Sequence, residues 1–333
     1  MIQYLVILLD DTSVSFCHYG NGHKERRLMP ADTLKAGILY GMKENLNIQF
    51  VYPDYDLPEE YDKIIESVDH SKIKPASRQE GADVVVIDGM EDAGKTDVRS
   101  GAAYVLRTDK TGLFGGHDII VKLLQNADRL NITLTDVDTF TDDDFDKYKD
   151  MLKLLAADIE KMYAEGHSPQ LNILTDRMML NKMNNCGAGD TTITLAPDGN
   201  FYVCPAFYQQ PGGYAIGNLK DGLDIKNSQL YRLDHAPLCR ICDAYQCRRC
   251  IWLNRKTTLE VNTPSHEQCV VAHLERNASR ELLIAIRKHG TFLPDYKEID
   301  KIDYLDPFDV KKNGKENNRT GNCRRKERDT GAV

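Results

Sequence analysis

The stretch CRICDAYQCRRC, residues 239–250, contains two C-x2-C pairs separated by four residues. Each pair can form a tight turn whose two thiolates face one metal. Three more cysteines flank this stretch at Cys186, Cys204 and Cys269, and Gly199 precedes Cys204 at the spacing G-x4-C. Seven of the nine cysteines therefore fall in one region, whereas unliganded cysteines do not repeat at ligand spacing. This region is predicted to bind metal.

The sequence predicts a cytoplasmic protein without a membrane span. The apolar run at residues 4–9 is too short to cross a bilayer, and Asp10 and Asp11 follow it at once. Reducing thiol pools disfavour disulfides in the cytoplasm, so another role is needed for the cysteines. Seven cysteines with His235 or His266 could fill two zinc sites of four ligands each, and iron-sulfur clusters are the alternative.

The first 180 residues alternate apolar runs rich in Val, Ile and Leu with segments of helical periodicity. Six buried parallel strands are predicted at residues 3–9, 47–52, 83–88, 103–108, 130–137 and 170–175. The clearest helix between them follows the N-cap candidate Thr141. Another begins at Pro30, with an apolar stripe of Leu34, Ile38, Leu39, Met42 and Leu46. This alternation fits either a doubly wound sheet or a barrel-like sheet.

The pattern changes after residue 180, where short strands and turns replace long helices. A hairpin is predicted around Pro197-Asp-Gly199, and a helix over residues 266–289 closes the folded part. The basic C-terminal tail, which contains Cys323, is predicted to be disordered.

The cysteine layout resembles that of the SPASM domain, an auxiliary-cluster module of radical S-adenosylmethionine enzymes that modify peptides. The resemblance covers roughly residues 180–275 and includes all seven cysteines. It implies two interleaved [4Fe-4S] clusters. One would be held by Cys239, Cys242, Cys247 and Cys269. The other would be held by Cys186, Cys204 and Cys250, with an open iron position where a substrate thiolate or amide could bind.

The first half is similar to a radical S-adenosylmethionine domain, a partial (β/α)6 barrel with a C-x3-C-x2-C loop after its first strand. Here Ser13, Cys17 and Gly20 occupy the three ligand positions, so only one thiolate is present. A functional radical cluster and S-adenosylmethionine binding are therefore not expected from this loop, because neither Ser nor Gly is a soft ligand. Cys17 is interpreted as a small buried or loop thiol.

The whole chain resembles the CXXX repeat peptide maturase family. The resemblance implies an α/β protein with a radical SAM-like partial barrel at residues 1–180, a SPASM-type domain at 181–290 and a C-terminal extension at 291–333. It also implies post-translational modification of a ribosomally made, Cys-rich precursor peptide. A true radical enzyme or another maturation protein is a candidate partner.

Two rival functions are open at this point. A zinc- or iron-sulfur-binding module that presents substrate without catalysis would have the same cysteines. A nucleotide-binding protein is the other, because Gly89, Gly94, Lys95 and Thr96 match the P-loop pattern G-x4-G-K-[ST]. The net charge of −8 does not favour nucleic acid as a partner.

Overall fold

The computed structural model describes residues 1–183 and 185–299. Its main feature is a sheet with the strand order β7-β6-β5-β4-β3-β2-β1-β8-β9. The strands are β1 (Tyr4–Leu8), β2 (Asn47–Val51), β3 (His70–Pro75), β4 (Val84–Asp88), β5 (Ala103–Thr108), β6 (Arg129–Leu134), β7 (Gln170–Leu171), β8 (Thr192–Leu195) and β9 (Phe201–Tyr202). A separate small hairpin pairs β10 (Gly217–Asn218) with β11 (Gly222–Leu223).

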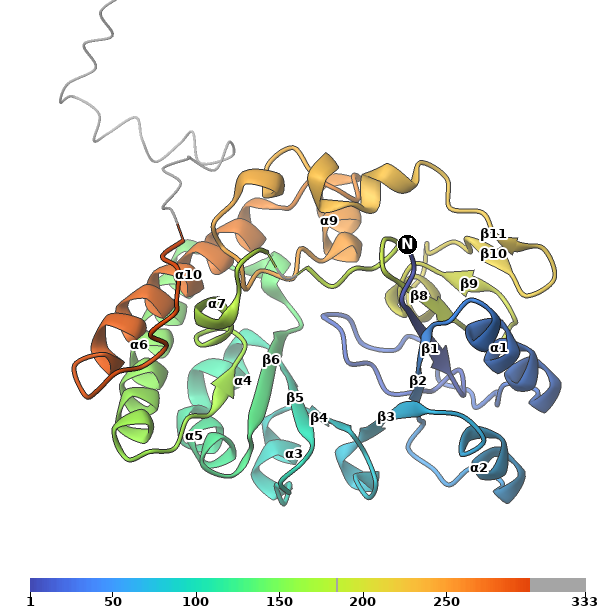
Figure 1. The fold of residues 1–333 in the computed structure, drawn as a ribbon, viewed down its shortest axis with the longest axis horizontal. Coiled ribbons are helices and arrows are strands. Elements are labelled where there is room, and N and C mark those ends of the chain that lie inside the picture. The colour runs from blue at the N-terminus through green and yellow to red at the C-terminus, as the bar shows by residue number, and fades with distance from the viewer. Residues whose placement is uncertain (184, 300–333) are drawn as a thin grey trace, which may run out of the picture. The chain divides into compact units, whose positions relative to one another are not determined.

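The strand order decides between the two expected architectures. Strands β1 to β7 are parallel and lie side by side in the order of the sequence. A doubly wound sheet would reverse this order at a switch point. The strands instead form an open arc with helices outside it, and the C-terminal segments extend across its open side (Figure 1). The prediction of a partial β/α barrel is confirmed.

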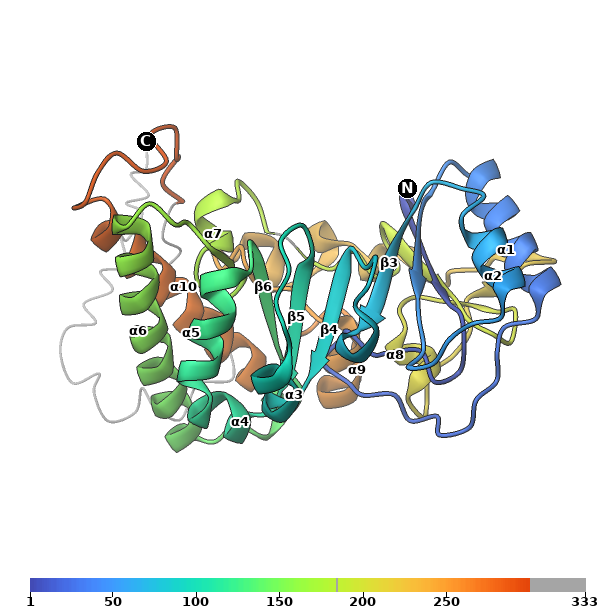
Figure 2. The same cartoon turned by 90° about the horizontal axis from the view of Figure 1, so that it is seen from below.

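The helices alternate with the strands as expected for this architecture, and Figure 2 shows α5 and α6 beside the strands β4 to β6. They are α1 (Ala31–Lys43), α2 (Glu59–Ile65), α3 (Met90–Lys95), α4 (Lys110–Gly115), α5 (His117–Asn126), α6 (Asp142–Ala164), α7 (Asp176–Met179), α8 (Ala206–Gln209), α9 (Ile251–Thr258) and α10 (His266–Ile286). Short 3-10 turns lie at Ala76–Arg78, Val137–Thr139, Ser228–Tyr231, Leu233–His235 and Cys239–Ile241.

Three sequence predictions for the barrel need correction. The strand predicted at residues 170–175 is only the two-residue β7, because residues 172–175 turn into α7. Strand β3 was missed, because only Ile73 and Pro75 of its six residues are buried and apolar periodicity is therefore weak. The predicted stripe on α1 is partly wrong, since Leu39 and Met42 are more than half exposed. Gly37 and Gly41 face the sheet instead, so the helix backbone can approach it closely.

Helix α6 begins as its sequence predicts. The Thr141 hydroxyl accepts a hydrogen bond from the Asp144 backbone N–H at 3.4 Å, and the Asp144 carboxylate accepts one from the Thr141 N–H at 2.9 Å. This is a capping box, which satisfies two backbone donors that the helix itself leaves unpaired.

Replacing Thr141 with alanine is expected to lower the free energy of unfolding by about 1 kcal/mol, because one N-cap acceptor is lost. Urea unfolding followed by circular dichroism measures this change. Thr141→Ser keeps the hydroxyl and is the control, for which no comparable loss is expected. Equal losses in both variants would contradict a role for the cap.

The described residues, 1–183 and 185–299, all belong to one compact unit. Strand β8 lies beyond the predicted boundary at residue 180, yet it pairs with β1 in the main sheet. The hairpin of β8 and β9 and the closing helix α10 confirm two local predictions. Within residues 1–183 and 185–299, every helix is too short or too polar to span a bilayer. The predicted disordered tail with Cys323 lies outside the described residues.

Candidate metal centres

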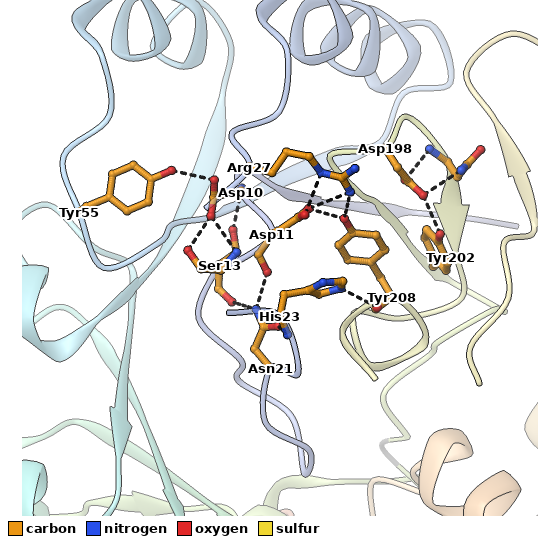
Figure 3. A network of polar contacts seen from close by, with 12 residues as sticks. Asp10, Asp11, Ser13, Asn21, His23, Arg27, Tyr55, Asp198, Tyr202 and Tyr208 are labelled. Carbon is orange, nitrogen blue, oxygen red and sulfur yellow. Dashed lines mark hydrogen bonds and ion pairs between the residues drawn. The ribbon is translucent and has the colours of Figure 1, made fainter. Parts of the chain in front are cut away.

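The loop that follows β1 is held by a network of polar contacts (Figure 3). The buried Ser13 hydroxyl accepts a hydrogen bond from the Asp10 N–H at 3.0 Å and donates one to the Val51 carbonyl at 2.8 Å. Arg27 forms an ion pair with Asp11 at 2.8 Å. Ser13 stands at the first position where the loop of radical S-adenosylmethionine domains has a cysteine. Here its hydroxyl holds the loop against strand β2.

The same loop is fastened to helix α8, which begins two residues after Cys204. The Gly22 N–H donates to the Gln209 carbonyl at 2.8 Å, and the Gln209 amide donates to the Ser13 carbonyl at 3.0 Å. His23 stacks on Tyr208 with ring centroids 4.8 Å apart. These contacts place the β1 loop beside the Cys204 segment, 190 positions further along the sequence.

Four cysteines, which we call the Cys17 group, lie within electrostatic range of one another: Cys17, Cys186, Cys204 and Cys250. The pKa of Cys204 lies well above its usual value because of desolvation and because the charges of Cys17, Cys250 and Cys186 oppose its ionisation. Desolvation and Cys186 raise the pKa of Cys17 to about 12. Since Coulomb interactions weaken with distance, the four thiols share one neighbourhood. Cys17 lies in the loop after β1, as the sequence predicted, and the structure places this loop thiol near the other three.

The second set, the Cys239 group, comprises Cys239, Cys242 and Cys247. Desolvation raises the pKa of Cys239 to about 11, and the charge of Cys242 acts in the same direction. The pKa of Cys247 is also raised, first by desolvation and then by Cys239. Backbone N–H groups donate to two of the sulfurs, at 3.4 Å each, as is usual for thiolates that bind iron.

Helix α10 lies against the Cys239 group. Cys269 is buried in its first turns, and His273 one turn later has its Nε2 atom 3.7 Å from the Cys242 sulfur. The Ala272 carbonyl accepts a hydrogen bond from the Gln246 side chain at 2.7 Å. His273 was not predicted as a site residue, although its spacing C-x3-H from Cys269 on a predicted helix was a usable signal.

Among the described residues, no two cysteines form a disulfide. Across residues 1–183 and 185–299, no three His, Cys, Asp or Glu side chains are placed to share a single metal ion. In a tetrahedral zinc site the sulfurs stand about 3.8 Å apart, as follows from zinc-sulfur bonds of ~2.3 Å. Each thiolate on a four-iron cluster binds a different iron atom, so its sulfurs stand farther apart. Soft thiol donors grouped in two sets fit such clusters chemically.

Two cavities open near these groups. One, of about 650 Å³, lies at the carboxyl ends of strands β1, β3, β4 and β5 and is lined by polar side chains that include Asp88 and Arg107. The other, of about 310 Å³, lies inside the barrel and reaches Cys247. His18 lines it and has a lowered pKa because it is desolvated, so its ring is neutral at pH 7. The His18 Nδ1 atom is 2.8 Å from the Leu134 carbonyl oxygen. Because a carbonyl oxygen can only accept a hydrogen bond, Nδ1 carries the ring proton and donates it.

The residues that match the P-loop pattern, Gly89 to Thr96, do not have the conformation that phosphate binding requires. Residues Met90–Lys95 are helical, whereas this part of a P-loop curls around phosphate. The Lys95 ammonium is paired with Glu91 at 2.6 Å on the exposed side of α3. This geometry does not favour nucleotide binding.

No protein-family model matches this chain, and no curated protein does. Among solved structures, native anSMEcpe with bound AdoMet superposes with a TM-score of 0.56 at 13% identity, over 85% of this chain and 99% of that one. The chain has the fold of anSMEcpe. A structure of anSMEcpe with bound AdoMet and Cp18Cys peptide gives a TM-score of 0.56 at 14% identity, over 86% of this chain and 100% of that one. Streptococcus suis SuiB bound to precursor peptide SuiA is more distant, with a TM-score of 0.45 at 12% identity, 80% of this chain and 76% of that one.

Proposed function

We propose that this protein takes part in the maturation of a ribosomally made, Cys-containing peptide and binds two [4Fe-4S] clusters in a SPASM-type region. The observation that carries the proposal is the gathering of thiols into two groups on a barrel of the anSMEcpe fold. The anSMEcpe structure with Cp18Cys peptide supports a peptide as the substrate class. Within the CXXX repeat peptide maturase family, the expected substrate is a Cys-rich precursor.

The Cys239 group together with Cys269 of α10 would hold one cluster, and three members of the Cys17 group would hold the other. Cys239, Cys242, Cys247 and Cys269 would bind the first. Cys186, Cys204 and Cys250 would supply three thiolates to the second. Clusters of this kind transfer electrons, and they act as Lewis acids where an iron lacks a protein ligand.

The barrel cavity beside Cys247 is where we propose that part of the peptide binds. Its volume of about 310 Å³ is large enough for one or two side chains of a peptide. The neutral His18 ring and the buried carboxyl group of Glu275 line it, so it offers both a hydrogen-bond acceptor and a titratable acid.

We also propose that a separate radical enzyme acts together with this protein. The β1 loop has one cysteine where the family loop has three, and Ser13 is committed to contacts within the protein. The chain would then present the peptide or transfer electrons to it, in the cytoplasm. S-adenosylmethionine would bind to the partner.

Anaerobic purification tests the cofactors. We expect a brown protein with broad absorption near ~400 nm and with about eight iron and eight sulfide ions per chain. Colourless protein with about two zinc ions would support the non-catalytic zinc module instead.

Peptide binding is tested separately, by fluorescence anisotropy of a labelled peptide with CXXX repeats against its Cys→Ser counterpart. We expect at least about tenfold tighter binding of the cysteine peptide, which corresponds to ~1.4 kcal/mol. Equal affinities would contradict a Cys-directed substrate site. Addition of ATP or GTP to wild-type protein and to Lys95→Ala checks the nucleotide alternative, for which we expect no binding by either.

A further inference from the structure

We propose that Cys17 is the fourth protein ligand of the cluster bound by Cys186, Cys204 and Cys250, so that this cluster has no vacant iron. The inference builds on the iron-sulfur part of the proposed function and changes one element of it. The sequence predicted an open iron at this site and assigned Cys17 no role. The tertiary structure brings this cysteine from the β1 loop to the other three.

An aromatic cluster joins the segments that carry three of these cysteines. The Tyr19 ring packs edge-on against Trp252 with centroids 6.0 Å apart, and Trp252 packs against Phe207 at 4.8 Å. All three rings are at least nine-tenths buried. Tyr19 follows Cys17 by two residues, Trp252 follows Cys250 by two, and Phe207 follows Cys204 by three. The rings therefore fix the three cysteine backbones close to one another.

Hydrogen bonds fix the backbone at Cys17 and at Cys186. The Arg107 Nε–H donates to the Cys17 carbonyl at 3.0 Å from strand β5, and the Arg107 side chain is only 4% exposed. The Cys186 N–H donates to the Arg248 carbonyl at 3.1 Å, two residues before Cys250. The Cys17 loop is thus held by the barrel, by α8 and by α9, and it cannot move far from the other thiols without breaking these contacts.

The electrostatic influence of each thiol on the others agrees with this arrangement. Cys17 and Cys186 both act on Cys204 and on Cys250. Four thiolates are the full ligand set of a [4Fe-4S] cluster. The β1 loop contains no second cysteine with which Cys17 could bind a separate cluster, and the same loop is folded toward the segments of Cys204 and Cys250. A cluster with four protein ligands would transfer electrons and would stabilise the β1 loop. The substrate would then bind at another site.

The test uses the full chain, reconstituted anaerobically with iron and sulfide, as wild type, Cys17→Ala and Cys323→Ala. Neither of the two proposed ligand sets includes Cys323, so its variant controls for the loss of a cysteine. Iron content and EPR spectra are measured after mild oxidation with ferricyanide, and again with added 2-mercaptoethanol. We expect that Cys17→Ala either loses up to half of the iron or gives a [3Fe-4S] signal and a spectrum that 2-mercaptoethanol shifts. Wild type and Cys323→Ala should show none of these changes.

Several results would overturn the proposal. One is a Cys17→Ala protein with the iron content, EPR spectrum and thiol response of wild type. Another is a wild-type cluster whose EPR spectrum shifts with 2-mercaptoethanol, because that response requires a vacant iron. This measurement uses wild-type protein, so it tests the proposal even if Cys17→Ala does not fold. Wild-type protein without any iron would remove the proposed cofactors as well, so the two failures are distinguishable.

Discussion

Replacing Asp243 with alanine is expected to cost about 3–5 kcal/mol of folding free energy, because two buried arginines would lose their counter-charge. Asp243 is completely buried between the two C-x2-C pairs. Its carboxylate is 2.7 Å from Arg276 and 3.8 Å from Arg177, and its backbone carbonyl accepts a hydrogen bond from Arg177 at 3.0 Å. Both arginines are at most 8% exposed, so water cannot replace the lost partner.

The measurement is the unfolding free energy of the variant, together with its iron content. We expect less iron in Asp243→Ala, because the carboxylate joins α7 and α10 to the turn that carries Cys242. Asp234→Ala, in the exposed Arg232–Asp234 pair, is the matched control, and little change is expected there. If Asp243→Ala is as stable as this control, the buried ion pairs do not hold the region together.

Stability is expected to fall by about 3 kcal/mol as the pH rises from about 4.5 to about 7, because Glu275 is buried. Desolvation raises the pKa of Glu275 to about 7. Hydrogen bonds donated by Tyr148 at 2.7 Å and Gln246 at 3.3 Å favour the ionised carboxylate and lower the pKa, but desolvation is the larger effect. A carboxyl group with a raised pKa in the folded state binds its proton more tightly there than in the unfolded state. The contribution of Glu275 to stability is therefore complete at low pH and is lost as the pH rises through the pKa that Glu275 has in the folded protein.

Glu275→Gln should remove this dependence, because the amide stays neutral throughout. We expect the variant to gain stability relative to wild type as the pH rises from 5 to 8, as measured by urea unfolding at each pH. Glu281→Gln lies on the exposed face of the same helix and is the control. A constant difference between wild type and Glu275→Gln across this range would show that Glu275 does not titrate as its burial implies.

Local chemistry was sufficient to predict much of the fold. The N-cap at Thr141 and the turn at Pro197-Asp-Gly199 depend on residues a few positions apart, and both appear as expected. Strand β3 was not predictable in this way, because its polar residues are ordered by pairing with β2 and β4. The inner face of α1 was also misassigned, since the close approach of the helix to the sheet selects Gly37 and Gly41.

The sequence by itself determined that cysteines gather at C-x2-C spacing between residues 239 and 250, because this spacing is a local property that each tight turn preserves. Only the tertiary structure decided which cysteines from distant segments meet. Cys17 and Cys204 lie almost 190 residues apart, and what brings them together is the burial of Tyr19, Trp252 and Phe207 in one aromatic cluster. Such long-range packing depends on the whole barrel being formed, so no short stretch of sequence contains it.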